Sequence, residues 1–568
     1  MNQTAVDAQM DLEGLPIFND NTLQDYLNHW ATHAPDKVWL IDRKGDQFQK
    51  WTWSEAQAEI AALAAYLESL PLKKSHKCAV LSRNCAHWAM ADLAIVASGG
   101  VTVPLFTTLP ADTARYILEF AEVEVLFVGA SPNWEQVKAI VPENVTVISL
   151  PEGPHADASE HWDDLSTRFS GQAPSYRAAH DDLMSIVFTS GTTGLPKGVM
   201  QTHDSMLVPM ERGSVAFSLR NHPRLFSYLP MAHIAERQIV LVQSLIRAGS
   251  IYFNESLETL ARDMADACPN YFFGAPRVWE QLQQAIIAKF GSQEALDQAL
   301  NSDPEGVSEL IRKGLGLDDA DYLLTAAAPT PASLIHWYER LGLHLKEGYG
   351  QTEAMGLSVN TNEERRIGSI GKPVQGVEMK IADNGELLCK APGLAVGYYR
   401  NPEKTAETFV DGWVHTGDKA KVDEDGFYYI TGRVKDYFKT IQGKFVSPIP
   451  IEDAFSGLTF VEQQCLLGRG YSKTVMLCVL SANGQQVESE EVERQILQRV
   501  AIVNEDLEKH ARIGAVIISK EPWSIENGLL TPTLKMRREQ LEEHFGSVAE
   551  SLARTSAEQG KILCHWFD

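Results

Sequence analysis

Basic charge, paired cysteines and long apolar runs are all scarce in this sequence. Its 568 residues carry 50 Lys and Arg against 75 Asp and Glu, a formal charge of −25. Nucleic-acid-binding proteins present a basic surface, so this balance argues against nucleic acid as a partner. Anionic small ligands stay open, because a site needs only local positive charge.

The seven cysteines are scattered, without a CxxC pair or a His/Cys spacing suited to zinc, which fits a reducing cytoplasm. The longest uncharged run, residues 93–111, is interrupted by Gly99, Gly100 and Pro104. It predicts a helix followed by a buried strand rather than a membrane span. The first residues lack the basic and apolar stretches of a secretory signal. We expect a cytoplasmic protein with no transmembrane segment, for which peripheral membrane contact stays open.

The composition is globular, with 44% apolar and 22% charged residues, and the length predicts three or four structural units. Apolar residues recur at helical spacing over 23–30 and over 60–67, the second after a predicted cap at Ser54. Residues 78–81, 125–128 and 185–188 read as short strands. This alternation predicts an α/β fold whose sheets are parallel and layered with crossover helices.

Two later segments differ from the first part of the chain in composition and in predicted secondary structure. Residues 151–182, rich in Pro, Gly, Ser and Asp, predict a loop. Residues 368–430 contain many turns and short runs, which predicts an all-β segment with hairpins. Beyond residue 435 the sequence predicts a smaller α+β unit, with a charged helix near 488–500 between strands at 475–480 and 515–519.

The most informative stretch is TSGTTGLPKG, residues 189–198, directly after a predicted strand. Its glycines let the backbone approach a ligand, and its hydroxyls and lysine are donors for phosphate oxygens. It is not a Walker A loop, because Pro196 stands where a second Gly should be, five positions after Gly191. The alternative is an ordinary surface turn. The expected phosphate-binding residues are Thr189, Ser190, Gly191, Thr192, Thr193, Gly194 and Lys197.

Four further segments follow in a fixed order: LPMAHIAER at 229–237, YGQTE at 349–353, WVHTGD at 413–418 and GRVKD at 432–436. Together with 189–198 they resemble the motifs of the adenylate-forming (AMP-binding) superfamily, which includes acyl-CoA synthetases, firefly luciferase and peptide-synthetase adenylation domains. The resemblance spans roughly residues 20–545. PRVWE at 276–280 and GLLTPTLKMRR at 528–538 are similar to the long-chain fatty-acyl-CoA synthetase branch.

The resemblance implies a nucleotide site built from several motifs. Tyr349 would stack on adenine, with Gly350 and Thr352 beside it in the ATP motif. Asp418 would accept hydrogen bonds from both ribose hydroxyls, and Arg433 would contact ribose or phosphate. Two of these residues also have an ordinary structural interpretation: Tyr349 as a buried core tyrosine and Asp418 as the start of a turn.

The resemblance also implies the groups that act on the reacting atoms. Mg²⁺ would be held by Thr192 and Glu353, since this ion takes few protein oxygen ligands. His233 would lie near the substrate carboxylate and the acyl group, although a lone His in an apolar stretch is commonly a core residue. Lys535 would bridge the carboxylate and the α-phosphate, stabilising charge in the transition state.

Domain organisation follows from the same resemblance. Residues 1–432 would form a large ATP- and acyl-binding domain, with a β-rich, barrel-like part at about 365–432. Residues 433–435 would be a hinge centred on Lys435, and residues 436–568 a small mobile α+β domain. Lys439 and Gly443 would face the site when this domain rotates for the second half-reaction.

One segment departs from the family pattern. A Gly-Gly-Ala turn is usual near the adenine and the acyl chain, whereas this chain has Ala326, Ala327 and Ala328. Each added methyl group takes space and disfavours positive φ. We therefore hypothesise a restricted or unusual acyl chain, which strong preference for palmitate or oleate would refute.

The implied activity is that of an acyl-CoA synthetase acting on a fatty or related carboxylic acid. ATP and coenzyme A would be co-substrates, and the products would be acyl-CoA, AMP and pyrophosphate. Two alternatives stay open: an acyl-AMP ligase that loads a carrier protein, and a nucleotide-binding pseudoenzyme. The sequence names neither the acid, nor the coenzyme A contacts, nor the oligomeric state.

Overall fold

A computed structural model of the protein describes residues 21–189, 195–458, 460–524, 527–531 and 536–567. These residues form two large mixed sheets and three smaller sheets of five, four and two strands. The first large sheet has eight strands in the order β19-β9-β8-β4-β3-β5-β6-β7. Their bounds are β3 Lys77–Leu81, β4 Val101–Leu105, β5 Val123–Val128, β6 Thr146–Ser149, β7 Glu160–His161, β8 Leu183–Thr189, β9 Lys197–Thr202 and β19 Gly397–Tyr398. The helices between them are α3 Trp53–Ser69, α4 Ala86–Ala97, α5 Ala111–Phe120, α6 Trp134–Lys138 and α7 Trp162–Arg168.

The second large sheet has nine strands in the order β16-β15-β14-β13-β12-β10-β11-β1-β2. Their bounds are β1 Val38–Lys44, β2 Gln47–Thr52, β10 Arg224–Ser227, β11 Ser250–Phe253, β12 Tyr271–Gly274, β13 Tyr322–Thr325, β14 Leu345–Gln351, β15 Ala354–Val359 and β16 Lys372–Pro373. Its helices include α2 Leu23–His33, α8 His203–Ala216, α9 Ile234–Glu236, the π-helix η2 Arg237–Val242, α10 Gln243–Arg247, α11 Leu260–Ala267, α12 Pro276–Phe290, α13 Gln293–Ser302, α14 Pro304–Leu315 and α15 Ala332–Glu339.

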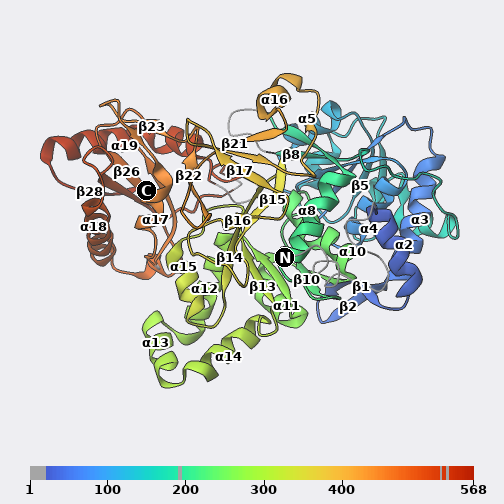
Figure 1. The fold of residues 1–568 in the computed structure, drawn as a ribbon, viewed down its shortest axis with the longest axis horizontal. Helices are drawn as coiled ribbons and strands as arrows, with labels where there is room; N and C mark the ends of the chain where they lie inside the picture. The colour runs from blue at the N-terminus through green and yellow to red at the C-terminus, as the bar shows by residue number, and fades with distance from the viewer. Residues whose placement is uncertain (1–20, 190–194, 459, 525–526, 532–535, 568) are drawn as a thin grey trace.

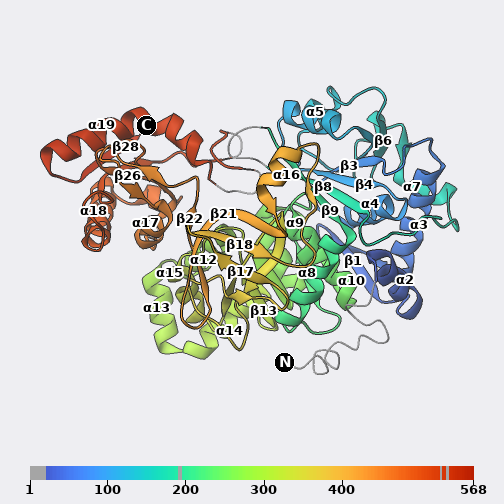
Figure 2. The ribbon, with the colours of Figure 1, turned by 45° about the horizontal axis from the view of Figure 1, so that its top comes forward.

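The β-rich part is a five-stranded antiparallel sheet that follows the second large sheet in the chain. It contains β17 Glu378–Ile381, β18 Glu386–Lys390, β20 Phe409–Val410, β21 Trp413–Val422 and β22 Tyr428–Arg433, with α16 Pro402–Thr408 inserted. The remaining chain forms a separate lobe, at the left in Figures 1 and 2. That lobe contains β23 Phe438–Lys439, β24 Phe445–Val446, α17 Pro448–Phe455, β25 Val461–Leu467, β26 Thr474–Leu480, α18 Ser489–Glu505, β27 Ile513–Ser519, α19 Arg538–Gln559 and β28 Leu563–Phe567.

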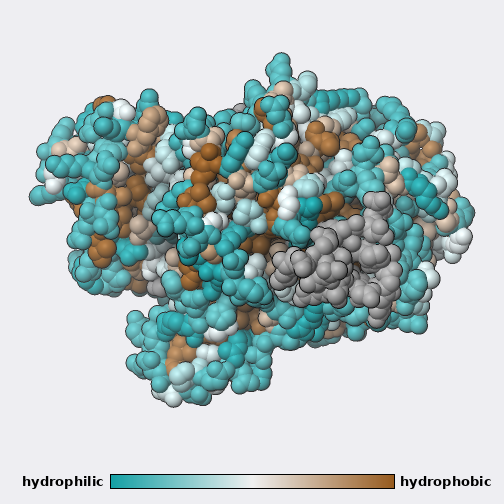
Figure 3. Space-filling model, in the orientation of Figure 1, coloured by the Kyte–Doolittle hydropathy of each residue, from teal (hydrophilic) through white to brown (hydrophobic). Residues whose placement is uncertain are grey.

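The largest hydrophobic core lies between the two large sheets. It includes residues of α2, α3 and α4 from one side and of α8, η2 and β10–β13 from the other. Hydrophilic residues predominate on the face drawn in Figure 3, which fits the acidic composition. No described helix combines the length and apolarity that crossing a membrane requires.

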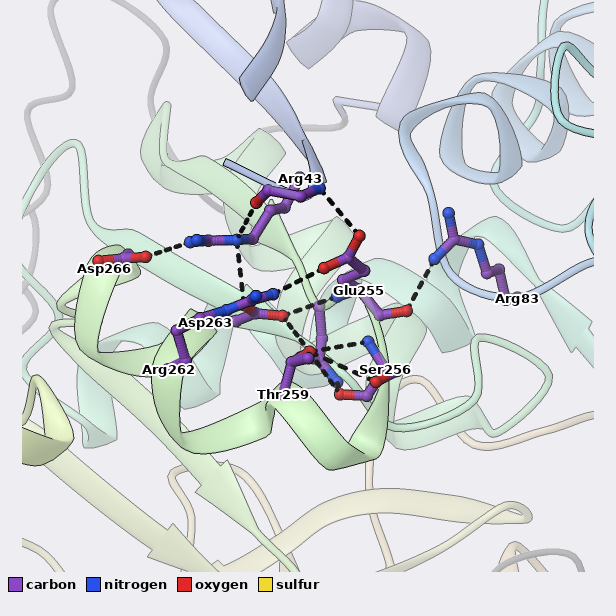
Figure 4. A network of polar contacts seen from close by, with 10 residues as sticks. Arg43, Arg83, Glu255, Ser256, Thr259, Arg262, Asp263 and Asp266 are labelled. Carbon is purple, nitrogen blue, oxygen red and sulfur yellow. Dashed lines mark hydrogen bonds and ion pairs between the residues drawn. The ribbon is translucent and has the colours of Figure 1, made fainter. Parts of the chain in front are cut away.

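A polar network ties the same two sheets together at their edges (Figure 4). Arg83, which follows β3, donates from Nη1 to the carbonyl of Glu255, which follows β11, at 2.7 Å. Arg43 on β1 pairs with Asp263 on α11 at 3.2 Å, and Glu255 pairs with Arg262 at 2.6 Å. The two sheets are therefore held by directional bonds as well as by apolar packing.

The predicted α/β class is confirmed, with one difference in strand direction. The sheet interiors are parallel, but β1–β2, β8–β9 and β14–β15 are antiparallel pairs, so both large sheets are mixed. The run 93–111 does contain the end of α4 followed by the buried strand β4.

Three local predictions were wrong. Thr52, not Ser54, caps α3, because its hydroxyl accepts from the backbone N–H of Glu55 while the Glu55 carboxylate accepts from Thr52 in return. The segment 151–182 contains α7, which buries Trp162 and Leu165. The all-β segment contains the short helix α16.

Candidate functional site

The predicted phosphate loop connects two antiparallel strands. β8 ends at Thr189 and β9 begins at Lys197, and these two residues pair across the hairpin. Residues 190–194, and so the predicted roles of Ser190, Gly191, Thr192, Thr193 and Gly194, lie outside the described residues. The hairpin geometry differs from a strand–loop–helix site, because no helix N-terminus follows the loop directly.

The strand β19 brings Tyr398 to this hairpin, and Tyr398 contacts Glu353, which lies in the turn between β14 and β15. β19 pairs with β9, so that Tyr398 lies opposite Val199. The Lys197 Nζ atom lies 5.9 Å from the centroid of the Tyr398 ring, and the Tyr398 hydroxyl donates to Glu353 Oε1 at 2.6 Å. The Lys197 ammonium therefore lies near the ring of Tyr398, and the predicted metal ligand Glu353 lies at its hydroxyl.

Lys197 lies in a cationic environment. Its pKa is lowered, first by burial and then by the neighbouring ammonium groups of Lys404 and Lys435, with Glu353 acting in the opposite direction. The repulsion between like charges that lie close together decreases when an anion binds between them. Lys197 is suited to bind a phosphate group. Lys404 on α16, which was not predicted from the sequence, also pairs with Glu407 at 2.8 Å.

A cleft of about 290 Å³ adjoins this cluster. Aromatic side chains of α5 and of the segment after β19 line it, together with the end of the phosphate hairpin: Tyr116, Phe120, Pro196, Lys197, Tyr398 and Tyr399. Lys197 is therefore accessible to a bound molecule.

The carboxylate of Asp418 is the most heavily hydrogen-bonded predicted group. Asp418 on β21 lies opposite Arg433 on β22, whose Nε is 2.9 Å from Oδ1. The Tyr349 hydroxyl at 2.5 Å and Gln351 Nε2 at 2.6 Å both donate to Oδ2. A carboxylate has about four acceptor sites, so three donors leave roughly one for a ribose hydroxyl.

Tyr349 is held in place by this contact. Burial, followed by the charge of Asp418, raises the pKa of the Tyr349 hydroxyl far above its usual value, so it stays a neutral donor. The neighbouring segment is fixed through its backbone: Gln201 Nε2 donates to the Thr352 carbonyl at 2.6 Å, and the Ala395 N–H donates to the Glu353 carbonyl at 3.1 Å. Tyr349 and Gly350 lie on β14, and Thr352 and Glu353 form the turn that follows it. The four residues therefore lie on one segment that is held by hydrogen bonds at both ends.

His233 occupies the N-cap of α9. Its Nδ1 accepts from the backbone N–H of Ala235 at 3.1 Å, and the ring is half-buried. Accepting at Nδ1 sets the neutral tautomer with the proton on Nε2. Glu236, in the same turn, is buried and accepts from the Tyr228 N–H at 3.0 Å, which fixes the loop that carries His233.

The Ala326–Ala327–Ala328 turn follows β13 directly. Ala327 has φ = +75°, a conformation that glycine adopts without cost and that the alanine methyl group disfavours. Ala326 packs against the central core, whereas Ala327 and Ala328 are exposed. The departure from a glycine pair thus produces a strained backbone position beside the site.

The predicted hinge begins where the β-rich sheet ends. Arg433 and Lys435 are exposed, and the Val434 N–H donates to the Gly417 carbonyl at 2.8 Å. Lys439 lies on β23, and Gly443, with φ = +73°, lies in the exposed turn before β24. Arg277 on α12 pairs with Glu462 on β25, which links the lobe to the large sheet. Lys535 lies outside the described residues.

The comparisons with known proteins match almost the whole chain. The family model for the AMP-binding enzyme matches residues 27–399, and the model for the AMP-binding enzyme C-terminal domain matches residues 435–555. This chain belongs to the AMP-binding enzyme family. A relative of this AMP-binding enzyme is "Long-chain-fatty-acid--CoA ligase FadD15" of Mycobacterium bovis, 30% identical over 88% of this chain and 92% of the relative.

Solved structures support the fold. The anthranilate CoA ligase AuaEII in complex with anthranoyl-AMP gives a TM-score of 0.78 at 23% identity, covering 95% of this chain and all of that one. The A-PCP didomain of carboxylic acid reductase from Segniliparus rugosus gives 0.80 at 22% identity, covering 98% of this AMP-binding enzyme and 84% of that chain. At these identities the likeness establishes the arrangement of sheets alone.

Four residues of the site of this AMP-binding enzyme were missed from the sequence: Gln201, Gln351, Tyr398 and Lys404. Gln351 lies inside the motif YGQTE at 349–353. Its amide side chain, between Gly350 and Thr352, could have been recognised from the sequence as a candidate hydrogen-bond donor. Tyr398 and Lys404 had no such signal, because they reach the site through a two-residue strand and a short helix.

Proposed function

We propose that this enzyme activates a fatty or related carboxylic acid with ATP and transfers the acyl group to coenzyme A. The convergence of Lys197, Glu353 and Asp418 carries this proposal. They come from the first large sheet, the second large sheet and the β-rich sheet. Lys197 and Glu353 meet at Tyr398, and Asp418 binds Tyr349, which lies four residues before Glu353 in the chain. A cation for phosphate, a carboxylate for metal and a carboxylate for ribose are what adenylation needs.

Tyr349 presents its ring to adenine, and Asp418 receives a ribose hydroxyl. Lys197, Lys404 and Lys435 neutralise the polyphosphate. His233 lies near the substrate carboxylate, and Lys535 approaches the α-phosphate from the C-terminal lobe. These groups place the acid oxygen in line with the bond to pyrophosphate.

Glu353 fits an Mg²⁺ ion. Its Oε1 is fixed by Tyr398, so the carboxylate has one set orientation, and Mg²⁺ takes one or two carboxylates together with substrate phosphates. The described residues contain no group of three acidic, His or Cys side chains that could hold a metal without the nucleotide. The bound ion would supply charge neutralisation on the phosphates.

Residues 433–435 act as the hinge in this proposal, with the large domain before them and the mobile domain after them. Rotation there withdraws Lys535 after adenylation and brings in Lys439 and Gly443 for attack by the coenzyme A thiol.

The test measures the two half-reactions separately. Acid-dependent exchange of pyrophosphate into ATP reports adenylation, and AMP release with thioester formation reports transfer to coenzyme A. Exchange without thioester would favour transfer to a carrier protein. Absence of exchange with a broad panel of acids would contradict the proposal and favour a nucleotide-binding pseudoenzyme.

Two variants test whether Lys535 and Lys435 serve different half-reactions. Lys535→Ala should depress exchange and leave thioester formation from supplied acyl-adenylate largely intact. Lys435→Pro should do the reverse, because a fixed φ hinders the hinge. Loss of the same half-reaction in both variants would overturn the two-conformation account.

A further inference from the structure

The segment PRVWE at 276–280 begins α12 where this helix meets the C-terminal lobe. Pro276 is the first residue of the helix and Arg277 the second. A cation in the first turn of a helix is unfavourable beside the positive end of the helix dipole, so Arg277 does not stabilise its own helix. Its guanidinium pairs instead with Glu462 on β25 of the lobe. Figures 1 and 2 both show α12 and α15 beside α17 of the lobe, so Arg277 belongs to a contact between the two domains.

Two hydrogen bonds join Arg277 to Glu462. Nη2 donates to the carboxylate oxygen Oε1, and Nη1 donates to the Glu462 carbonyl oxygen at 3.3 Å. The two side chains are 20% and 34% exposed, so the pair is partly shielded from water. A planar guanidinium that binds both the side chain and the backbone of one residue fixes direction as well as distance. The contact therefore holds β25 in one orientation relative to α12.

Carboxyl groups predominate at the rest of this boundary. Burial raises the pKa of Glu280, one turn after Arg277, to about 7; Arg277 lowers it and the charge of Glu462 raises it further. Burial also raises the pKa of Glu347 on β14 to about 8, with a contribution in the same direction from Asp453 on α17. Acidic groups of the two domains thus repel each other when they are ionised. Arg277 offsets this repulsion across the boundary.

The observed orientation of the lobe leaves the turn around Gly443 in solvent. Lys439 is exposed, and Ile441 and Phe445 are 70% and 60% exposed. A Cβ atom added at Gly443 would meet no described atom within 4 Å. The proposed second half-reaction needs Lys439 and Gly443 at the site. The observed orientation therefore precedes that step and corresponds to adenylation.

Rotation of the lobe must break the Arg277 contact. β23, β24, α17 and β25 share one hydrophobic core, to which each contributes a buried residue: Phe438, Val446, Phe455 and Leu466. These elements therefore move as one body. A rotation about residues 433–435 that carries β23 and β24 to the site also carries β25, and with it Glu462, away from α12.

We propose that Arg277 and Glu462 form a positioning pair that holds the lobe in the orientation for adenylation and separates before transfer to coenzyme A. This inference rests on the proposed two-step function and goes beyond it by naming a contact, remote from the hinge, that opposes the rotation. Both residues act through the position of the lobe and not on the reacting atoms. The strength of the pair therefore sets the balance between the two half-reactions.

The test compares Arg277→Gln and Glu462→Gln with the unmodified full chain. Two rates are measured: pyrophosphate exchange with the best-exchanging acid, and thioester formation from the supplied adenylate of that acid. The ratio of thioester formation to exchange should rise about threefold to fivefold in each variant, the upper range for a partly exposed ion pair. An unchanged ratio in both variants would overturn the positioning pair.

A second readout does not depend on activity. Lys435 at the hinge is exposed, and trypsin cleaves after lysine. Cleavage requires local opening of the backbone, which a less constrained lobe allows more often. Appearance of the fragment that ends at Lys435 should therefore be faster in Arg277→Gln and Glu462→Gln than in the unmodified chain, and equal rates in all three would contradict the proposal.

Two further variants are the controls. Arg277→Glu combined with Glu462→Arg keeps an ion pair of reversed polarity and should return the ratio to within about twofold of the unmodified value. Arg340→Gln removes a comparable pair with Asp297 inside the large domain and should change neither readout. A charge-reversed double variant as perturbed as the single ones would overturn the pairing, and so would a shift in Arg340→Gln equal to that in Arg277→Gln.

The outcomes also distinguish this inference from the proposed function. Absence of exchange with any acid would remove the proposed function, and tryptic cleavage would then decide alone whether the pair holds the lobe. Exchange and thioester formation at a ratio that neither single variant alters would leave the function intact and overturn the positioning pair.

Discussion

Replacing Asp418 by Asn tests how the nucleotide site recognises ribose. The Asp418 carboxylate receives two donors at Oδ2 and the Arg433 guanidinium at Oδ1. An amide offers one accepting oxygen. If that oxygen keeps the bonds from Tyr349 and Gln351, the NH₂ group faces the Arg433 N–H, and no acceptor is left for ribose.

The expected loss can be worked from these contacts. A hydrogen bond to a charged group contributes about 1.5–3 kcal/mol, and the one that Asp418 has left for ribose is lost. A loss of about 2–3 kcal/mol corresponds to a roughly 30- to 150-fold rise in Kd for ATP. Stability should change little, because the pair with the half-exposed Arg433 is worth at most about 1 kcal/mol.

The assay is isothermal titration of Mg·ATP into the enzyme without acid, with the unfolding midpoint as a check on folding. Tyr349→Phe is the matched control: it keeps the ring, frees an acceptor site on Asp418 and should leave Kd within about threefold. Binding by Asp418→Asn as tight as that of the unmodified enzyme would refute the carboxylate's role. An equal loss of affinity in Tyr349→Phe would show that the Tyr349 hydroxyl, rather than the carboxylate, is needed for ATP binding.

Three further predictions concern stability. Ala327→Gly removes the strain of a φ of +75° and should raise the free energy of unfolding by about 1 kcal/mol. In the control Ala328→Gly, where φ is not positive, the free energy of unfolding should fall by about 0.5–1 kcal/mol. Denaturant melts of the two variants measure both changes. Burial raises the pKa of Glu236 from 4.5 to about 8, so the folded state holds a proton that the unfolded chain releases, and this group's contribution falls as pH rises from about 4.5 to 8. Glu236→Gln should therefore gain stability relative to the unmodified enzyme between pH 6 and pH 9, and a constant difference in melting temperature would contradict the assignment. Asp92→Ala leaves the buried Arg237 guanidinium, paired at 2.7 Å, without its partner and should cost about 3–5 kcal/mol, while Asp92→Leu combined with Arg237→Met should cost much less in the same melts.

The sequence was informative wherever a local pattern carried the structure. The order of motifs predicted the family, and strands such as β3, β5 and β8 followed from short apolar runs. The α3 cap was misplaced by two residues, because Thr52 and Ser54 are both good caps and only the reciprocal bond with Glu55 selects Thr52.

Where contacts join distant segments, sequence patterns gave no guide. The Tyr398–Glu353 bond joins residues 45 positions apart through a two-residue strand, and the Tyr349–Asp418 bond spans 69 positions. Seven-residue helices such as α7 bury only two side chains, too few to produce a period. Tertiary packing decides such elements, and only the folded chain displays it.

The pairing of β9 with β19 has a consequence for synthesis on the ribosome. β9 is complete at residue 202, but the strand that covers its outer edge begins at residue 397. At about 5–20 residues per second, that edge waits roughly 10–40 s for its neighbour. During this interval an open strand edge with unpaired backbone N–H and C=O groups is available to other nascent chains. The yield of folded enzyme should therefore respond to translation speed and to holding chaperones more than the stability of the finished protein would suggest.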